Sequence, residues 1–374
     1  MSSMAIDRRN FLIGSALLLS STSRAFAGVL GDADDAMPGD LIAASRAPDG
    51  RYSVVVLTFD GMILRELPLQ GRGHDIALDR ASGRAVVFAR RPGNFALGFN
   101  VRDEGEPVLF TTPENRHFYG HGVFSRDGRL LYATEHDAET RQGLLGVYSA
   151  AAGYKRIGEL PTYGIGPHEV ILLKDGKTLA VANGGIETHI ETGREKLNVD
   201  TMMPSLAFID AGSGALLAQH EQSKDLHKLS IRHIAADARG NVWFGGQWEG
   251  DTADTPELVG CAGRDKPLRI IEPATPRGAE LSGYIGAVAI DGEGRVLAAS
   301  APRAGRIIYV DTETSSIIGE TQLMDGCGLT GVSQDKFALS SGMGVLQTER
   351  PDHTHLTTAS FPGRAFDNHL RLIR

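Results

Sequence analysis

Histidine recurs at one point of a short phrase that repeats along this 374-residue sequence. The phrase consists of a small or polar residue, the histidine, alternating apolar residues and a charged turn that contains glycine. Five copies place His74, His121, His168, His233 and His369 at this point, and two others place Gly286 and Cys327 there. Imidazole is a frequent metal ligand and a proton carrier near neutral pH. A fold that gathers these side chains would therefore create a metal site or a polar-ligand site.

The spacing of the phrases indicates which fold could gather them. The seven copies begin near residues 73, 120, 167, 232, 285, 326 and 368, and a recurrence of about 50 residues with strand-type alternation is typical of a β-propeller. The second repeat divides into four alternating stretches at 122–125, 130–135, 143–149 and 154–160. We therefore expect an all-β, seven-bladed propeller with four antiparallel strands in each blade.

The two ends of the chain are predicted to complete one blade together. The last phrase is only one strand long, whereas three strand-like stretches stand near the other end, at 40–47, 52–60 and 62–69. We expect the final strand to be the innermost strand of the seventh blade, with these three stretches outside it, which closes the ring and removes exposed sheet edges. Residues 39–374 then form a single domain, preceded by a loose leader at 28–38.

Residues 1–27 have the pattern of an export signal. Arg8 and Arg9 precede a short apolar stretch, and Ala25-Phe26-Ala27 fits the small-residue pattern of a signal cleavage site. The paired arginines followed by Phe11 favour the twin-arginine pathway and therefore a periplasmic location. No later segment is long enough to span a bilayer, so no membrane span is expected after cleavage. Removal of the signal takes the net charge from −8 to −10, which disfavours nucleic acid as a partner.

Propeller geometry predicts which residues share the face of the repeated histidines. The first strand of each blade lines the central channel, and its start lies on the same face as the loop between the second and third strands. That face should receive Arg90, Arg91, Glu135, His136, Asp137, Glu187, His189, Gln247 and Glu249. We expect Glu187, His189, Gln247 and Glu249 to contact a bound ligand or cofactor, the first two from an insertion at 183–205.

Imidazoles and carboxylates together favour iron, copper or zinc, whereas calcium and magnesium prefer oxygen ligands alone. The predicted metal ligands are drawn from the five repeated histidines, with Cys327 added because it occupies the same point of the phrase. A cysteine at such a place also fits a small buried apolar side chain. Cys261 and Cys327 fall in different predicted blades, which argues against a disulfide between them.

Two other interpretations remain open from the residues alone. In the first, the histidines only bridge neighbouring blades through hydrogen bonds, and the protein is a scaffold that docks a partner. In the second, the site belongs to a metal-dependent hydrolase or oxidoreductase. The chain has no GxSxG, HExxH or CxxCH motif, so no catalytic residue is assigned. His168 with Glu169 is the pair that a hydrolase would use first.

Several segments carry a resemblance to a known family. The twin-arginine leader and the stretches at 164–189, 193–198, 229–237, 242–250 and 366–370 resemble the bacterial family of unknown function numbered 1513. The resemblance covers nearly the whole mature chain and implies a seven-bladed propeller of the YVTN type, similar to WD40 propellers. It also implies imelysin-like and dihaem peroxidase-like partners, encoded in clusters suspected of handling iron. The resemblance does not imply any particular reaction.

These observations together predict a periplasmic propeller that binds a transition-metal ion or a polar ligand at the mouth of its axial channel. The resemblance places this activity in an iron or metal uptake system. The identity of the ion and the existence of a catalytic step are left open by the sequence.

Overall fold

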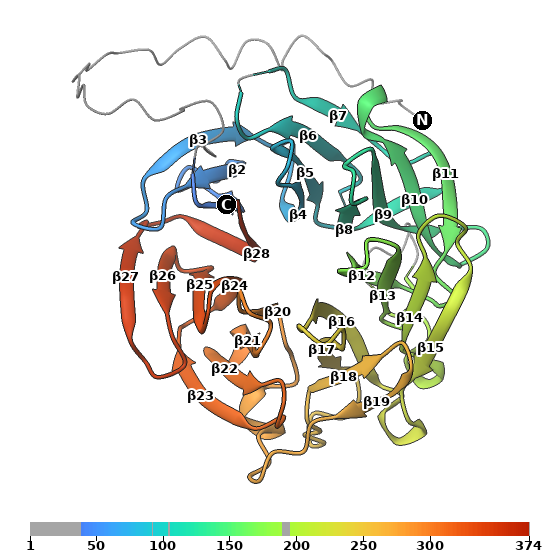
Figure 1. The fold of residues 1–374 in the computed structure, drawn as a ribbon, viewed down its shortest axis with the longest axis vertical. Coiled ribbons are helices and arrows are strands. Elements are labelled where there is room, and N and C mark those ends of the chain that lie inside the picture. Colours follow the sequence, from blue (N-terminus) through green and yellow to red (C-terminus); the bar gives the residue numbers. More distant parts are fainter. Residues whose placement is uncertain (1–38, 92, 104, 189–194, 374) are drawn as a thin grey trace. The chain divides into compact units, whose positions relative to one another are not determined.

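The computed structural model describes residues 39–91, 93–103, 105–188 and 195–373, and they form seven four-stranded antiparallel sheets around a common centre (Figure 1). The prediction of an all-β, seven-bladed propeller is therefore confirmed. The predicted signal at 1–27 and the leader at 28–38 lie outside the described residues. Within these residues no helix is both long enough and apolar enough to cross a membrane.

Six of the blades are built from strands that follow one another in the chain, and the first strand of each lies nearest the centre (Figure 1). Blade 1 comprises β4 (Gly73–Asp79), β5 (Arg84–Ala89), β6 (Ala96–Asn100) and β7 (Val108–Phe110), and blade 2 comprises β8 (Arg116–Phe124), β9 (Leu130–Asp137), β10 (Gly143–Ser149) and β11 (Lys155–Pro161). Blade 3 comprises β12 (Pro167–Leu172), β13 (Thr178–Asn183), β14 (Ser205–Asp210) and β15 (Leu216–Glu221). Blade 4 comprises β16 (Leu229–Ala236), β17 (Val242–Trp248), β18 (Val259–Gly263) and β19 (Lys266–Ile270).

The remaining blades follow the same pattern, and short 3-10 turns occur in the loops. Blade 5 comprises β20 (Ala287–Ile290), β21 (Val296–Ala301), β22 (Arg306–Asp311) and β23 (Ile317–Gln322), and blade 6 comprises β24 (Gly326–Ser333), β25 (Lys336–Ser341), β26 (Val345–Glu349) and β27 (His355–Ser360). The 3-10 turns are Ala150–Ala152, Val199–Thr201, Lys224–Leu226, Gly278–Leu281 and Pro302–Ala304.

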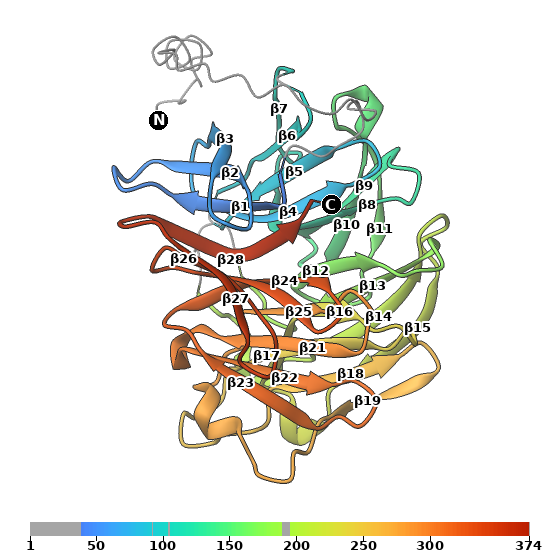
Figure 2. The same cartoon turned by 60° about the vertical axis from the view of Figure 1, so that its left-hand side comes forward.

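Blade 7 joins the two ends of the described chain. Its sheet has the order β28-β1-β2-β3, with β28 (Ala365–Leu372) innermost, followed by β1 (Leu41–Arg46), β2 (Tyr52–Leu57) and β3 (Ile63–Pro68). Figure 2 shows β28 lying beside β1. The predicted ring closure is confirmed, and every blade has the same strand count.

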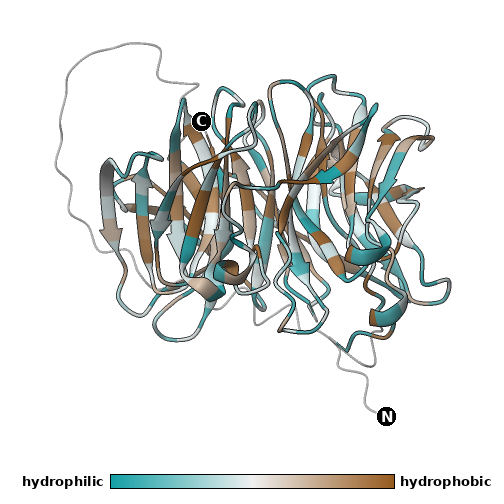
Figure 3. Ribbon diagram, turned by 90° about the horizontal axis from the view of Figure 1, so that it is seen from below, coloured by the Kyte–Doolittle hydropathy of each residue, from teal (hydrophilic) through white to brown (hydrophobic). Residues whose placement is uncertain are grey.

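Apolar side chains on both faces of each sheet pack against the neighbouring blades. Phe88 of blade 1 and Phe118 of blade 2 belong to one buried cluster, and their ring centroids lie 5.4 Å apart. Gly122 allows this approach, because a Cβ atom at that position would lie 2.6 Å from the ring of Phe88. Figure 3 shows hydrophobic segments mainly within the strands. The sheets thus bury their apolar surface against each other, as expected for a repeat architecture.

The innermost strands carry an irregularity that the sequence did not reveal. The pairing of the first two strands shifts register around the repeated histidine in five blades: between Gly73 and Ile76, Phe118 and Gly122, Pro167 and Glu169, Ile231 and His233, and opposite Ala43 to Ser45 in blade 7. β8 accordingly begins six residues earlier than predicted. A β-bulge breaks the strict alternation of side chains and re-aims them. Successive residues of the phrase can therefore both face the channel.

Ring closure by β28 yields the first prediction. Leu370 of β28 is fully buried in a cluster that also contains Leu41 and Leu346. Leu370→Ala should lower the free energy of unfolding by about 2–5 kcal/mol, because it leaves a cavity at the closing strand. Leu217→Ala is the matched control: Leu217 is 43% exposed on the outermost strand of blade 3, and its change should be within about 0.5 kcal/mol. Equal effects in denaturant unfolding would contradict closure by β28.

Candidate metal centre

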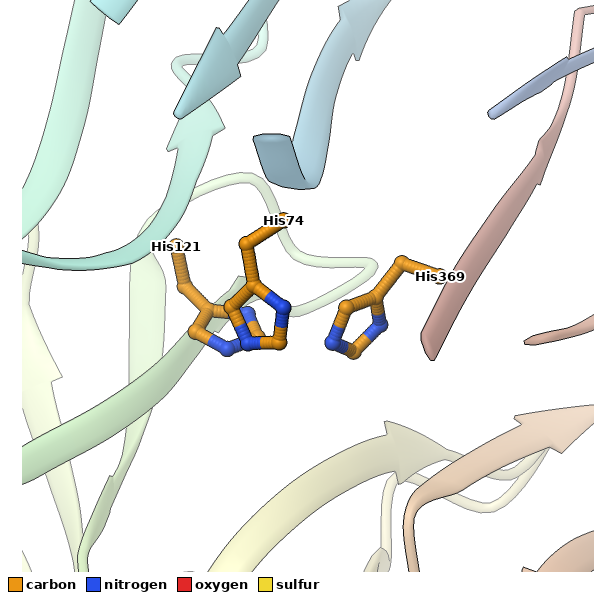
Figure 4. Close-up of side chains that lie close together, drawn as sticks. All are labelled: His74, His121 and His369. Carbon is orange, nitrogen blue, oxygen red and sulfur yellow. The ribbon is translucent and has the colours of Figure 1, made fainter. Parts of the chain in front are cut away.

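The five repeated histidines form a closed ring of imidazoles at the centre of the propeller. Going round it in the order 74, 121, 168, 233, 369 and back to 74, the distances between ring centroids are 4.8, 4.7, 4.6, 4.9 and 4.7 Å. All five side chains are buried. Figure 4 shows His74, His121 and His369 gathered with ring nitrogens facing one another. The predicted convergence of histidines from distant segments is therefore present in the structure.

Three carboxylates orient the rings, each reaching from one blade to the next. Asp367 of blade 7 lies 2.9 Å from His74 Nδ1, and Asp75 of blade 1 lies 3.0 Å from His121 Nδ1. Glu169 of blade 3 lies 3.3 Å from His233 Nδ1. An ionised carboxylate only accepts hydrogen bonds, so each Nδ1 carries the hydrogen and each Nε2 keeps a free lone pair. This is the tautomer that a metal-binding histidine requires.

The guanidinium of Arg371 supports two of these carboxylates from below the ring. Its Nη2 lies 2.7 and 2.8 Å from the two oxygens of Asp75 and 3.2 Å from Glu169 Oε1. Burial alone would raise the pKa of Asp75, but the charge of Arg371 brings it well below the usual range. Burial likewise opposes ionisation of Glu169, but the hydrogen bond with His233 and the charge of Arg371 lower its pKa to about 2. Both groups are therefore ionised at neutral pH.

Four of the repeated histidines, His74, His168, His233 and His369, have a pKa that burial lowers. Burial, together with the charge of Arg90, places the pKa of His74 well below its ordinary value. Burial and the charge of Arg232 do the same for His168. Burial lowers the pKa of His233 to about 4, even though its contact with Glu169 favours the charged form. Neutral imidazole is the form that binds metal ions.

Several ring nitrogens are buried without a hydrogen-bond partner. These atoms are Nε2 of His121, Nε2 of His369 and Nδ1 of His168. One ligand atom each from His74, His121 and His369 lies within 4.8 Å of the other two, and the same holds for His121, His168 and His233. Bonds of about 2.0–2.1 Å bring nitrogens closer than this around one ion, so small ring movements would complete a site. The arrangement is suited to hold a cation.

A cavity of about 340 Å³ lies above the ring, and we term it the vestibule. Its floor includes His74, His168 and His233, and its wall includes Arg91, Arg232 and Glu249. The side chains on the floor belong to the ring, so the vestibule gives a ligand access to it. Arg371, by contrast, lines a depression on the opposite face, where the charged turns lie.

Of the four residues predicted to contact a ligand, two line the vestibule. Gln247 and Glu249 line the vestibule, and an oxygen of Glu249 pairs with Lys196. Glu187 is ion-paired with Arg141, at 3.1 Å, and is not part of the vestibule lining. His189 lies outside the described residues.

Cys327 is not among the described groups of side chains that could share one ion. Its Sγ lies 3.4 Å from the carbonyl oxygen of Asp367 and 3.6 Å from that of Phe366. Burial raises the pKa of its thiol, which disfavours the thiolate that a metal binds. Cys327 and Cys261 are both free, as predicted. The structure therefore gives Cys327 a packing role beside β28.

The expectation that Glu135 faces the channel mouth is wrong. Glu135 is fully buried within blade 2, where it accepts a hydrogen bond from the hydroxyl of Tyr148 and one from Arg156 Nη2, at 3.0 Å. On β8 its pairing partner is Phe118, which precedes the strand predicted at 122–125. The longer β8 thus covers the residue and keeps it from the mouth.

Sequence reasoning missed the carboxylates as partners of the histidines. Asp75 and Glu169 directly follow a repeated histidine, and Asp367 stands two residues before another. Alternation predicted that adjacent side chains face opposite ways, and the bulges overturn this. A signal was nevertheless present, because an acidic residue stands within two positions of three of the five histidines.

The comparisons with known proteins agree with this fold. The model of a family described as a protein of unknown function, DUF1513, matches residues 67–373. The chain belongs to the DUF1513 family. A search of curated proteins gave no match for this DUF1513 protein.

Two solved structures are similar to this DUF1513 protein in fold. One is hydrazine synthase from Kuenenia stuttgartiensis, with a TM-score of 0.57 and 13% identity, covering 91% of this chain and 100% of that one. Another is a functionally unknown protein from Desulfotomaculum acetoxidans DSM 771, with a TM-score of 0.61 and 10% identity, covering 89% and 98%. At these identities the likeness shows the propeller alone.

The lowered pKa of His233 predicts acid sensitivity of the metal-free protein. In the unfolded chain His233 takes up a proton near pH 6.5, whereas in the folded protein it does so only near pH 4. Between these values the unfolded state binds more protons, so stability is present above pH 6.5 and is lost as pH falls toward 4. Melting temperatures measured from pH 7 to 4 should fall less steeply for His233→Gln than for the wild type. Parallel curves would show that His233 is not held neutral by burial.

Proposed function

We propose that this protein binds a divalent first-row transition-metal ion in its histidine ring and serves in the uptake of iron or a related metal in the periplasm. The observation that carries the metal site is the set of buried ring nitrogens without partners, His121 Nε2 foremost, facing other imidazoles whose hydrogens are directed outward to carboxylates. The ring presents lone pairs to a common space, and a cation is what such a space accepts.

A purely structural role would explain the hydrogen bonds that some of the histidines make through one ring nitrogen. It would not explain why other ring nitrogens are buried without a partner. The Nδ1 atoms of His74, His121 and His233 do bridge neighbouring blades, as the scaffold interpretation expects. Bridging would be complete without the second nitrogen, yet leaving a buried polar atom unsatisfied costs about 1–3 kcal/mol. Repeating this cost around a ring is unfavourable unless a ligand compensates for it. A bound metal ion supplies that compensation.

The donor set favours a transition metal over calcium or magnesium. The facing atoms are imidazole nitrogens, which suit zinc, copper, iron and nickel, whereas hard cations take oxygen ligands. The carboxylates fix ring orientation through the hydrogen on Nδ1, an arrangement that strengthens metal binding by histidine. His121 belongs to both described histidine trios, so it is central to the site.

Metal titration tests the site directly. Metal-free protein should bind Fe²⁺ under anaerobic conditions, or Zn²⁺ or Cu²⁺, at one ion per chain in calorimetry, with confirmation by elemental analysis. His121→Asn should weaken binding at least about 100-fold, since loss of a supporting residue alone costs 10–100-fold in metal sites. His227→Asn is the matched control, because His227 lies near the surface with its Nδ1 against the carbonyl oxygen of Lys224.

Folding of the variants is checked by the melting temperature of the metal-free proteins, and His369→Gln provides a second change in the ring. Wild-type protein that binds none of the three ions would refute the proposal. So would unchanged affinity in both His121→Asn and His369→Gln.

Export to the periplasm is part of the proposal and has its own test. The support is the Arg8-Arg9 pair followed by Phe11 and a short apolar stretch. Replacing both arginines by lysine should keep the protein in the cytoplasm, because the twin-arginine pathway depends on the pair. Cell fractionation followed by immunoblotting measures this, and replacement of Arg24 by lysine serves as the control. Undiminished periplasmic protein in the double variant would contradict export by this route.

Service in metal uptake is supported by the family resemblance, with its imelysin-like and dihaem peroxidase-like neighbours. A strain lacking the protein should accumulate less iron, or another bound metal, during growth at limiting metal concentration. Restoration by the wild type but not by His121→Asn would connect uptake to the ring.

A further inference from the structure

The vestibule above the histidine ring carries an excess of positive charge. Its described lining contains five cationic side chains and one carboxylate: Arg90, Arg91, Lys196, Arg232 and Arg303 against Glu249. Lys196 is paired with Glu249, and Arg90 is paired with Asp367 at 3.0 Å. These pairs offset two of the five cations, and among the described residues neither Arg232 nor Arg303 forms an ion pair.

Arg232 is the central cation of this excess. It is only partly exposed, its Nε atom is buried, and that atom has no hydrogen-bond partner. Among the described residues the guanidinium of Arg232 forms no ion pair. Burial lowers its pKa to about 10, so it is still charged at neutral pH. A shielded cation without a counter-ion is unfavourable unless a ligand provides the opposite charge.

The sequence position of Arg232 is also unusual within the repeats. The residue just before the repeated histidine is Gly73, Gly120, Pro167 or Asn368 in the other four blades. Only blade 4 has a charge there. The register shift between Ile231 and His233 falls at Arg232, and both Arg232 and His233 line the vestibule. An uncharged residue is thus compatible with this bulge, and packing of the strand does not demand the arginine.

Two further guanidinium groups lie on the same cavity. Arg91 is held over the ring of Tyr119, 4.5 Å from its centroid, and its Nη1 donates to Thr188 Oγ1 at 2.8 Å. Arg303 is exposed and lies over the ring of Tyr284, 4.8 Å from its centroid. Contact with an aromatic face orients both groups, and the exposed guanidinium of Arg303 presents the donors in its plane to a ligand. Planar guanidinium groups match the oxygens of carboxylates and phosphates.

We propose that the vestibule is a binding site for a small oxyanion, a carboxylate or phosphate compound, held by Arg232 with Arg303. The site goes beyond the metal function because it needs no ion in the ring. A volume of about 340 Å³ is at the lower end of the range for small-molecule pockets, which fits a compact anion. The anion would lie directly against His168 and His233 on the floor.

Calorimetry on the metal-free full chain, in a buffer free of phosphate and at low ionic strength, tests the site. Inorganic phosphate and citrate are the two probes, and binding of either supports the site and identifies which anion class it prefers. Arg232→Gln should weaken that binding at least tenfold, and added salt should weaken it further in the wild type because exposed charges are screened.

Arg126→Gln is the matched control, since Arg126 is exposed and lines the depression on the opposite face. Arg303→Gln is a second variant at an exposed position and should weaken binding severalfold, so the test stands even if Arg232→Gln does not fold. Absence of binding of both probes to the wild type would overturn the proposal, as would equal affinity in the wild type, Arg232→Gln and Arg303→Gln.

Metal titration of the same preparations separates the two proposals. Metal binding without anion binding refutes the oxyanion site alone, whereas anion binding without metal binding refutes the metal proposal alone.

Discussion

The hydrogen bond between a carboxylate of one blade and the Nδ1 of a histidine in another is the interaction on which the central site depends. Asp75, Glu169 and Asp367 each make one such bond, and each joins successive blades around the ring. The bond fixes the tautomer of the imidazole, and it also connects neighbouring sheets beside the channel. The same contacts therefore join neighbouring blades and orient the imidazoles of the candidate metal site.

Charge is distributed along the channel in a definite order. Arg371 lies below the histidines, bound to Asp75 and Glu169, while Arg232 and its neighbours lie above them in the vestibule. The imidazoles stand between the guanidinium of Arg371, whose charge the two carboxylates offset, and the cationic side chains of the vestibule. A metal ion in the ring would add positive charge to a region already rich in guanidinium groups, which makes an oxyanion in the vestibule electrostatically favourable. The positive charge of the proposed metal ion and the negative charge of the proposed oxyanion would thus offset each other across the histidines that line both sites.

Blades 5 and 6 depart from the pattern in a way that leaves room for the ring. They place Gly286 and Cys327 where the other blades place histidine, and the ring nevertheless closes, with 4.9 Å between the centroids of His233 and His369. The Gly286 carbonyl accepts a hydrogen bond from Asn368 Nδ2 at 3.2 Å, and Cys327 packs against the backbone of β28. Small side chains at these two points allow five imidazoles from seven blades to meet.

The amino-acid sequence by itself determined the propeller, the shared blade of the two chain ends and the recurrence of histidine at one structural point, because spacing and alternation are properties of the chain that need no coordinates. The tertiary structure decided which other groups join those histidines. Bulges at the repeated phrase turn Asp75 and Glu169 toward the channel, contrary to strict alternation, and the longer β8 covers Glu135 within its blade. Such placements depend on contacts between segments as far apart as Asp75 and Arg371, whose distance is set only when the ring closes.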